Sequence, residues 1–163
     1  MSILNNIRLL LLASWLGAAI FFSAAVAPSA FRVLRAFDLP NASEMAGAIV
    51  TRTLSVVNIS GFILSVLLLI TAFALKESYR RRAFILQTVL LLIVAITTGV
   101  GEWVIAAKMR GLRAAMHTTI DQIPAGDPSR VAFDALHGYS VTALSIAIIA
   151  ALIAFFVIAN RAE

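Results

Sequence analysis

The sequence predicts an all-α integral membrane protein, a four-helix bundle made of two helical hairpins. The first observation behind this is a set of four long apolar stretches, at about 9–27, 56–75, 83–107 and 139–159. A helix needs about 20 apolar residues to cross the hydrocarbon core of a bilayer, and each stretch meets that length. The second observation is composition. Hydrophobic residues make up 61% of the chain and charged residues only 13%, about half the charge of an average soluble domain.

The four stretches leave no length for a separate soluble domain, so we expect residues 1–163 to form a single transmembrane domain. Cysteine is absent from the sequence, which excludes disulfides, thiolate metal sites and thiol catalysis. The net charge of +5 comes from cations at the ends of apolar stretches, where membrane flanks account for them. We therefore expect no nucleic-acid partner.

The first stretch is expected to remain as a transmembrane helix. A cleaved signal peptide is the alternative, because Arg8 precedes an apolar run that ends in Ala25-Val26-Ala27. That run is about 19 residues long, however, whereas the apolar region of a signal peptide has about 7–15. Pro28 directly follows the candidate cleavage site, which disfavours cleavage. This proline either kinks the helix or begins its last turns.

The second and fourth helices are expected to extend beyond the membrane. Asn41, followed by Glu44, predicts an N-cap with a reciprocal side-chain bond, and no proline interrupts the sequence from there to Lys76. Asp127 followed by Pro128 predicts another helix start, with an N-cap and a proline at the first helical position. Each helix would then exceed about 30 residues, or roughly 50 Å, against about 30 Å of hydrocarbon.

Small residues at four-residue spacing predict close contacts between helices. Backbones approach closely in lipid through small side chains, because little hydrophobic force acts between helices there. The alternative is that alanine is simply common in this chain. The pairs and triplets are Ala13/Gly17, Gly61/Ser65, Thr97/Gly101 and Ala143/Ala147/Ala151.

Polar residues are expected to gather at one end of the bundle. The first and third connections between helices lie on the same side of the membrane, and they bring polar residues of all four helices together. The predicted site residues are Arg32, Arg52, Asn58, Glu102, Arg130, Asp134 and His137. The last three fall at i, i+4 and i+7, on one face of one helix. The opposite end is expected to hold only the basic segment 76–82 and the two termini.

Glu102 is the only acidic residue inside a predicted span. A glutamate exposed to lipid is costly, whereas one that faces the bundle can pair with Arg52, Arg32 or His137. We therefore predict a buried or half-buried ionic cluster of Glu102, Arg52 and His137, with Asn58 bonding a neighbouring helix. Such a cluster either lines a functional cavity or holds four helix ends together.

No nucleophile motif, phosphate-binding glycine loop or pair of opposed carboxylates is present, so we expect a protein that is not an enzyme. His137 and His117 have side chains able to ligate a haem, a chlorin or a metal, and His137 is the weak candidate for a metal ligand. No second histidine lies in a span and no zinc spacing occurs. We therefore predict no cofactor, and we expect bound lipid.

Short motifs occur through most of the chain: Trp15-Leu16-Gly17, Val26-Ala27-Pro28, Phe31-Arg32, Ala46-Gly47-Ala48-Ile49-Val50 with Arg52, Leu112-Arg113, and Phe133 with Leu136-His137-Gly138-Tyr139-Ser140. Together they resemble the bacterial "domain of unknown function 4149" family, which is related to the eukaryotic transmembrane protein 205. The resemblance implies a four-helix bundle with no established biochemical activity. The chain departs from the family pattern at Leu144, where the family often has asparagine, and at Ile105-Ala106-Ala107, where it often has a proline.

Three functions remain open from the sequence. The first is an accessory or scaffold subunit of a larger membrane complex. The second is a carrier or channel for a small solute or ion, which requires a water-accessible cavity near Glu102 and His137. A tetrapyrrole- or metal-binding protein is the third and least favoured.

The expected partners are the lipid bilayer and either other membrane subunits or further copies of the chain. The density of cations in the short segment 76–82 predicts that this segment and both termini are cytoplasmic. We expect the protein to lie in a bacterial inner membrane, as a multi-pass protein.

Overall fold

The computed structural model of the protein describes residues 3–37, 39, 41–75 and 80–160. The described residues form helices, turns and short connections, without strands. The helices are α1 (Ile3–Phe21), the π-helix η1 (Phe22–Val26), α2 (Ala27–Ala36), α3 (Ala42–Ala74), α4 (Arg81–Gly99), the π-helix η3 (Val100–Ala106), α5 (Ala107–Ala115), the short 3-10 helix η4 (Ile120–Gln122) and α6 (Pro128–Ala159). Because α1–η1–α2 and α4–η3–α5 are each continuous, the described chain forms four helical rods.

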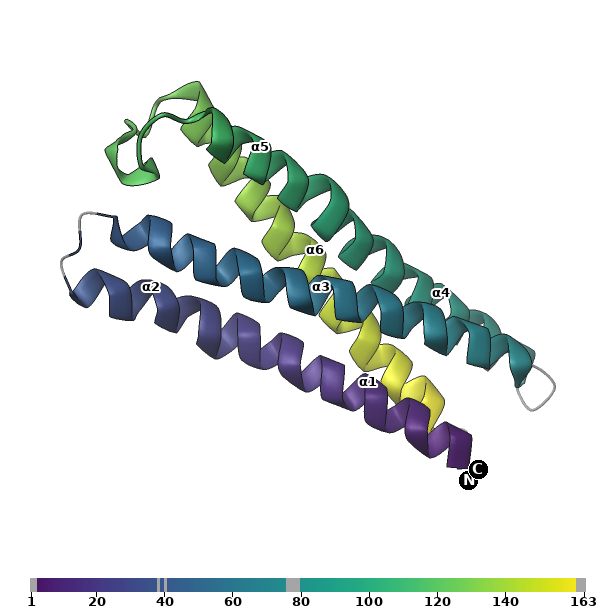
Figure 1. Cartoon of the computed structure of the whole chain (residues 1–163). Helices are drawn as coiled ribbons and strands as arrows, with labels where there is room; N and C mark the ends of the chain where they lie inside the picture. The colour runs from purple at the N-terminus through teal and green to yellow at the C-terminus, as the bar shows by residue number, and fades with distance from the viewer. Residues whose placement is uncertain (1–2, 38, 40, 76–79, 161–163) are drawn as a thin grey trace.

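The four rods lie side by side along the length of the molecule (Figure 1). The first rod packs against α3 and α6, and α4 packs against the same two helices. The start of α1 and the end of α6 lie together with the end of α3 and the start of α4, at what we call the terminal end. The opposite end, the loop end, carries the connections that precede α3 and α6. Toward it, α2 and α3 diverge from α5 and α6 (Figure 1).

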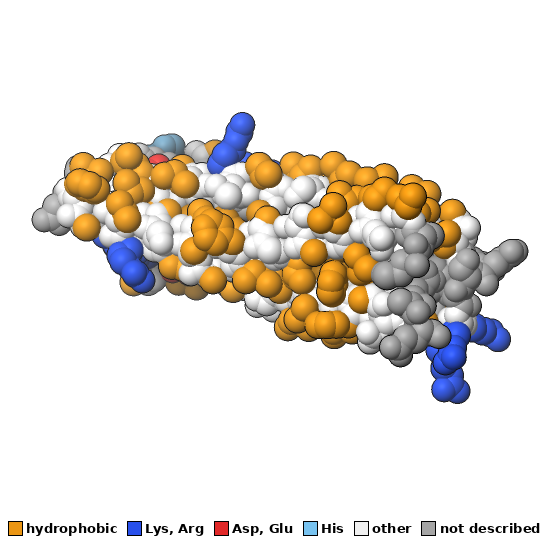
Figure 2. Space-filling model, turned by 90° about the horizontal axis from the view of Figure 1, so that it is seen from below, with side chains coloured by type: hydrophobic (Ala, Val, Ile, Leu, Met, Phe, Trp, Pro, Cys, Tyr) orange, Lys and Arg blue, Asp and Glu red, His pale blue; other side chains and the backbone are white. Residues whose placement is uncertain are grey.

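All four rods are long and apolar enough to cross a membrane. They contain 34, 33, 35 and 32 residues, and their most apolar windows have mean hydropathies of 2.2 to 2.9. Large apolar side chains cover much of the outer surface along the rods (Figure 2). The protein is therefore a multi-pass, all-α membrane protein, which confirms the predicted fold class. The predicted extension of the second and fourth helices is also confirmed, but the first and third rods are just as long, which the sequence did not indicate.

A π-helical segment explains why the first rod continues past its predicted span. Pro28 lacks a backbone N–H and its ring crowds the carbonyl one turn earlier, which normally breaks an α-helix. Here η1 precedes the proline, and the N–H of Ala27 donates to the carbonyl of Phe22 in the wider i→i+5 pattern. The helix then continues as α2 to Ala36. Similarly, η3 joins α4 to α5 without an interruption.

The two predicted helix starts differ in how they are capped. The Asp127 side chain accepts a hydrogen bond from the N–H of Ser129 at 2.8 Å, with Pro128 in the first turn, as predicted. Asn41 occupies the N-cap position of α3 but makes no side-chain cap bond. The predicted reciprocal bond with Glu44 is therefore wrong. The Glu44 carboxylate instead pairs with Arg113 on another rod, which competes for the same side chain.

The interior combines bulky side chains of three rods with the small side chains of α6. Leu12, Leu68 and Leu91 are among the most buried residues, and α6 faces them with fully buried alanines. Trp15 lies on Gly61, and its indole Nε1 donates to the Val57 carbonyl at 3.0 Å. Close approach of α1 to α3 therefore depends on the missing side chain at position 61.

Burial tests the predicted small-residue contacts. Gly61/Ser65 and Ala147/Ala151 are buried, as predicted, and Gly101 is buried against α3. Ala13 and Gly17 are exposed, so the prediction for that pair is wrong. The reason is that α1 turns its larger residues inward, at positions 12, 15, 16 and 19.

Substitution of Gly61 by alanine tests the contact between α1 and α3. The added Cβ would lie 2.7 Å from Cζ2 of Trp15, so the ring must move and its bond to Val57 is strained. We expect Gly61→Ala to destabilise the protein by about 1–3 kcal/mol, measured by thermal unfolding in detergent micelles. Gly17→Ala is the matched control, because no atom lies within 4 Å of the added Cβ. An equal effect of the two substitutions would contradict the assigned contact.

Candidate functional site

A cavity of about 1020 Å³ lies at the loop end, between the two diverging hairpins. Its walls come from α2, α3, α5, η4 and α6. The lining residues are Phe31, Arg35, Ser43, Glu44, Gly47, Ala48, Val50, Thr51, Arg52, Ser55, Met109, Arg110, Arg113, Ala114, Ile120, Asp121, Arg130, Phe133, Asp134 and His137. Every one of them falls outside the four apolar stretches of the sequence. The cavity therefore lies at the depth of the membrane–water interface.

The lining of the cavity is both basic and apolar. Five arginines contribute to it, from α2, α3, α5 and α6, against three acidic residues, Glu44, Asp121 and Asp134. Phe31, Phe133 and other apolar side chains form the rest of the wall. The excess of guanidinium groups over carboxylates makes the cavity electropositive, so it attracts anions.

Two of these arginines hold the walls of the cavity in place. Arg113 on α5 forms an ion pair with Glu44 on α3, and its Nη1 donates to the Thr118 carbonyl at 2.8 Å. Arg130 on α6 donates to the carbonyl of Ile123 in the connection before it. Because these bonds join different rods and a connection, they fix the shape of the loop end.

Glu102 lies in η3 beside the cavity and is 6% exposed. Its Oε1 accepts from Nη1 of Arg110 at 3.4 Å, and the Arg110 side chain is 53% exposed and lines the cavity. Charge-assisted hydrogen bonds are usually about 2.7–2.9 Å long, so this pair is loose. The second carboxylate oxygen, Oε2, is buried without a hydrogen-bond partner among the described residues.

The π-helical segment explains why Glu102 pairs with Arg110. In a regular α-helix, residues eight apart are rotated by about 80° from one another around the axis. Because η3 replaces i→i+4 bonds by i→i+5 bonds, it takes up extra residues per turn, which brings positions 102 and 110 onto one face. Arg110 was not among the predicted site residues, because the third apolar stretch was expected to end at residue 107 and Arg110 lies beyond it.

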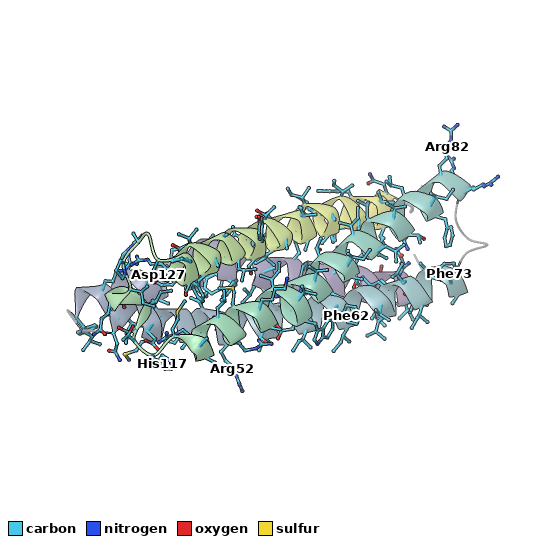
Figure 3. All side chains as sticks on the ribbon, turned by 90° about the horizontal axis from the view of Figure 1, so that it is seen from above. Arg52, Phe62, Phe73, Arg82, His117 and Asp127 are labelled. Atoms are coloured by element: carbon cyan, nitrogen blue, oxygen red, sulfur yellow. The ribbon has the colours of Figure 1, made fainter. Side chains whose placement is uncertain are left out.

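The structure brings four of the predicted site residues to the cavity and places three elsewhere. Arg52, Arg130, Asp134 and His137 line it, and the Arg52 side chain extends away from the helices (Figure 3). Asn58 is buried on α3, where its amide lies against Gly101 of η3. Arg32, on α2, is exposed and is not part of the lining. Glu102 is paired with Arg110 in place of Arg52, Arg32 or His137, so the predicted ionic cluster does not form in that composition.

The histidines lie at the loop end, where His117 is exposed in the connection before α6 (Figure 3). His137 is the one histidine among the described residues that line the cavity. Within the described part of the chain, no group of three or more His, Asp and Glu side chains is placed to hold a metal ion. The predictions about cofactors and bound lipid remain predictions.

A second set of buried polar residues, Asn5, Arg8 and Gln87, lies toward the terminal end, where only basic groups and termini were expected. Arg8, interpreted as a membrane flank, is 1% exposed, and its Nη2 donates to the Leu68 carbonyl at 3.4 Å. Gln87 of α4 is 0% exposed, and neither of its amide atoms has a hydrogen-bond partner among the described residues.

The sequence does contain a signal for this second set. Asn5, Arg8, Leu12, Trp15 and Ala19 follow one another at helical spacings of three and four residues, and all are buried. A single inward face therefore runs through α1 from its first turn, and it includes the arginine. The apolar run that begins at residue 9 concealed this, because the residues before it were assigned to the flank.

The family described as a domain of unknown function (DUF4149) matches residues 10–118 of the chain, which is more than half of its length. The match begins within α1, continues through the third rod and ends before α6, so His137 lies outside it. Neither the curated proteins nor the solved structures contain a match to the chain.

Thiol labelling tests whether the cavity is open to water. The chain has no cysteine, so single cysteines can be introduced at matched serines on α3. Ser55 lines the cavity, whereas Ser65 is 1% exposed in the core. We expect Ser55→Cys to react at least about tenfold faster than Ser65→Cys with a charged, membrane-impermeant thiol reagent. Equal, slow reaction at both positions would show that the loop end is closed.

Gln87→Met tests the assignment of an unbonded amide in the interior. Replacing a buried polar group that has no partner by an apolar group of similar shape is neutral or stabilising. We expect thermal unfolding to show a stability raised by up to about 1 kcal/mol. Gln122→Met, at an exposed position in η4, is the control and should leave the stability unchanged. A clear loss of stability in Gln87→Met alone would mean that the amide has a bonding partner.

Proposed function

We propose that the chain, which belongs to the DUF4149 family, is a membrane carrier for a small organic anion with an apolar part. The cavity at the loop end is its binding site. The observation that supports this most is the cavity itself, which is lined by arginines and apolar side chains beyond the apolar stretches of the rods. Among the three functions left open by the sequence, the carrier or channel is the one for which a water-accessible cavity near Glu102 and His137 was expected.

The lining favours an anion over a cation or a neutral sugar. Among the described lining residues, Arg35 belongs to no ion pair, and Arg110 is held only by its loose bond to Glu102. A guanidinium group presents several N–H donors in a planar fork that matches carboxylates, sulfonates and phosphates. Phe31 and Phe133 in the same wall provide apolar surface for the rest of the ligand.

A carrier exposes its site to one side of the membrane at a time, and the packing beyond the cavity agrees with that requirement. Leu12, Trp15, Leu68 and Leu91 fill the interior between the loop end and the terminal end. A ligand in the cavity is therefore separated from the far side by buried apolar side chains. In the proposed cycle, the hairpins move relative to one another to open the other side.

The accessory-subunit role remains a prediction. Exposed apolar side chains along the rods fit a partner subunit and fit lipid equally well. Purification in mild detergent decides between them, because an accessory subunit is expected to copurify with other membrane proteins. The cytoplasmic position of the termini, the bacterial inner membrane and the absence of enzymatic activity are likewise predictions.

Binding of an alkyl sulfonate tests the proposed function. The purified protein in neutral detergent is titrated with a short-chain alkyl sulfonate by calorimetry. We expect saturable binding, with the affinity reduced at least about tenfold in Arg110→Gln, because a hydrogen bond to a charged group contributes about 1.5–3 kcal/mol. Lys108→Gln is the matched control, since Lys108 is exposed on the same helix and is not part of the lining.

Two further arms make this experiment specific. Arg110→Gln leaves Glu102 without its partner, so Arg110→Gln/Glu102→Gln is included and should lose the same affinity without a buried unpaired charge. In the second arm, a short-chain anionic phospholipid competes with the sulfonate. Displacement identifies a lipid headgroup as the natural anion, and no displacement identifies a soluble one. Absence of saturable sulfonate binding, or equal loss in Lys108→Gln, would contradict the proposal.

A further inference from the structure

We infer that binding of the anion in the cavity is coupled to the uptake of one proton by Glu102. The inference rests on the proposed function and assigns to Glu102 a role that is distinct from direct contact with the ligand. It follows from the way in which Arg110 is shared between a buried carboxylate and the cavity.

The Arg110 side chain contacts Glu102 and also lines the cavity. Its Nη1 lies 3.4 Å from Oε1 of Glu102, yet more than half of its side chain is exposed and it forms part of the cavity wall. Arg113, by comparison, is fixed by a short ion pair to Glu44 and by the Thr118 carbonyl. An anion that enters the cavity therefore finds in Arg110 a guanidinium group that is loosely held and within reach.

Among the described residues, Arg110 is the one cation that forms an ion pair with Glu102. The Glu102 carboxylate is almost fully buried, it is absent from the cavity lining, and Oε2 has no hydrogen-bond partner among the described residues. Asn58 of α3, which carries no charge, lies against the adjoining Gly101. An ionised carboxylate left alone in such surroundings is strongly unfavourable, because it loses its counter-ion without gaining water.

Other charged or titratable groups on the elements packed against η3 have other partners or are exposed. Arg113 on α5 pairs with Glu44 on α3, and Arg130 on α6 donates to the Ile123 carbonyl. The exposed ones are Lys108 on α5, Tyr139 on α6, and Arg81 and Arg82 at the start of α4.

Arg110 lies on α5, Arg52 on α3, and Asp134 and His137 on α6. The last three are exposed and line the cavity, so water or the ligand solvates them. A proton bound to Oε2 needs no further ligand, whereas a metal ion needs several, and the described residues provide no group of three or more acidic or histidine side chains.

The exchange balances in charge. Before binding, the Arg110 guanidinium is paired with the Glu102 carboxylate. Afterwards, the guanidinium is paired with the anion, and Glu102 is a neutral carboxylic acid that has taken a proton from water. One anion and one proton enter together, so no net charge is added to the protein. A carrier built in this way moves its anion with a proton and is driven by a pH gradient.

The test is the pH dependence of alkyl sulfonate binding to the full chain in neutral detergent. The sulfonate group does not titrate near neutral pH, so any proton taken up belongs to the protein. Binding with uptake of one proton strengthens as the pH falls, by about tenfold per pH unit. Calorimetry in two buffers with different ionisation enthalpies then counts the protons directly, and this measurement on the unaltered protein requires no variant.

Glu102→Gln keeps the shape of the side chain and removes its charge. We expect this variant to bind the sulfonate with no proton uptake and no dependence on pH, and at neutral pH at least as tightly as the unaltered chain, because Arg110 is released. Asp134→Asn and His137→Gln, which change the other titratable groups on α6 beside η3, should each keep the pH dependence.

Several outcomes would overturn the inference while the proposed function stands. They are binding by the unaltered protein without proton uptake, a pH dependence that persists in Glu102→Gln or disappears in His137→Gln, and an affinity that follows the sodium concentration at constant pH. If the unaltered protein does not bind the sulfonate at all, the proposed function fails, and this inference fails with it.

Discussion

Lipid offers no hydrogen bonds, so each backbone N–H and C=O of a crossing segment must be satisfied within the segment itself. This constraint shapes the whole molecule. It keeps four helical rods continuous over 32 to 35 residues each, including the first rod, which passes through Pro28. Two rods remain unbroken by widening into π-helical segments, which keep the backbone bonded while they shift the register of the side chains.

The shift of register in the third rod connects the membrane interior to the cavity. It turns Glu102 and Arg110 onto the same face of the rod. The Glu102 carboxylate inside the bundle can therefore pair with the Arg110 guanidinium at the loop end. π-Helical segments often occur at functional sites, because they present groups that a regular α-helix would direct elsewhere. In the present chain η3 lies where the hairpins begin to diverge (Figure 1).

The fold could be predicted from the sequence because it depends on the length and apolarity of segments. The length and apolarity of a segment can be read correctly even when its ends are placed a few residues wrong. Local signals such as Asp127-Pro128 also mark a helix start, here with a specific hydrogen bond. The grouping of Arg52, Arg130, Asp134 and His137 around the cavity was also accessible, since connections on one side of a membrane bring their flanks together.

The pairing inside the site could not be predicted in the same way. The partner of Glu102 depends on a π-helical segment that no residue pattern in the sequence predicts. Arg8 was assigned to a flank because it precedes an apolar run, although in three dimensions its side chain points into the bundle and reaches the Leu68 carbonyl. Periodicity over the whole first helix, rather than the edges of its apolar stretch, carried the information.

We conclude that lipid surrounds the rods while water fills the cavity at the loop end. A nitroxide scan along α3 in liposomes tests it most directly, with oxygen as the probe of hydrocarbon and a water-soluble nickel complex as the probe of water. We expect labels at the outward-facing positions Ile59, Ile63 and Ile70 to collide with oxygen and not with the nickel complex, and a label at Ala48 to show the reverse. Equal access of the nickel complex to Ile63 and Ala48 would contradict it.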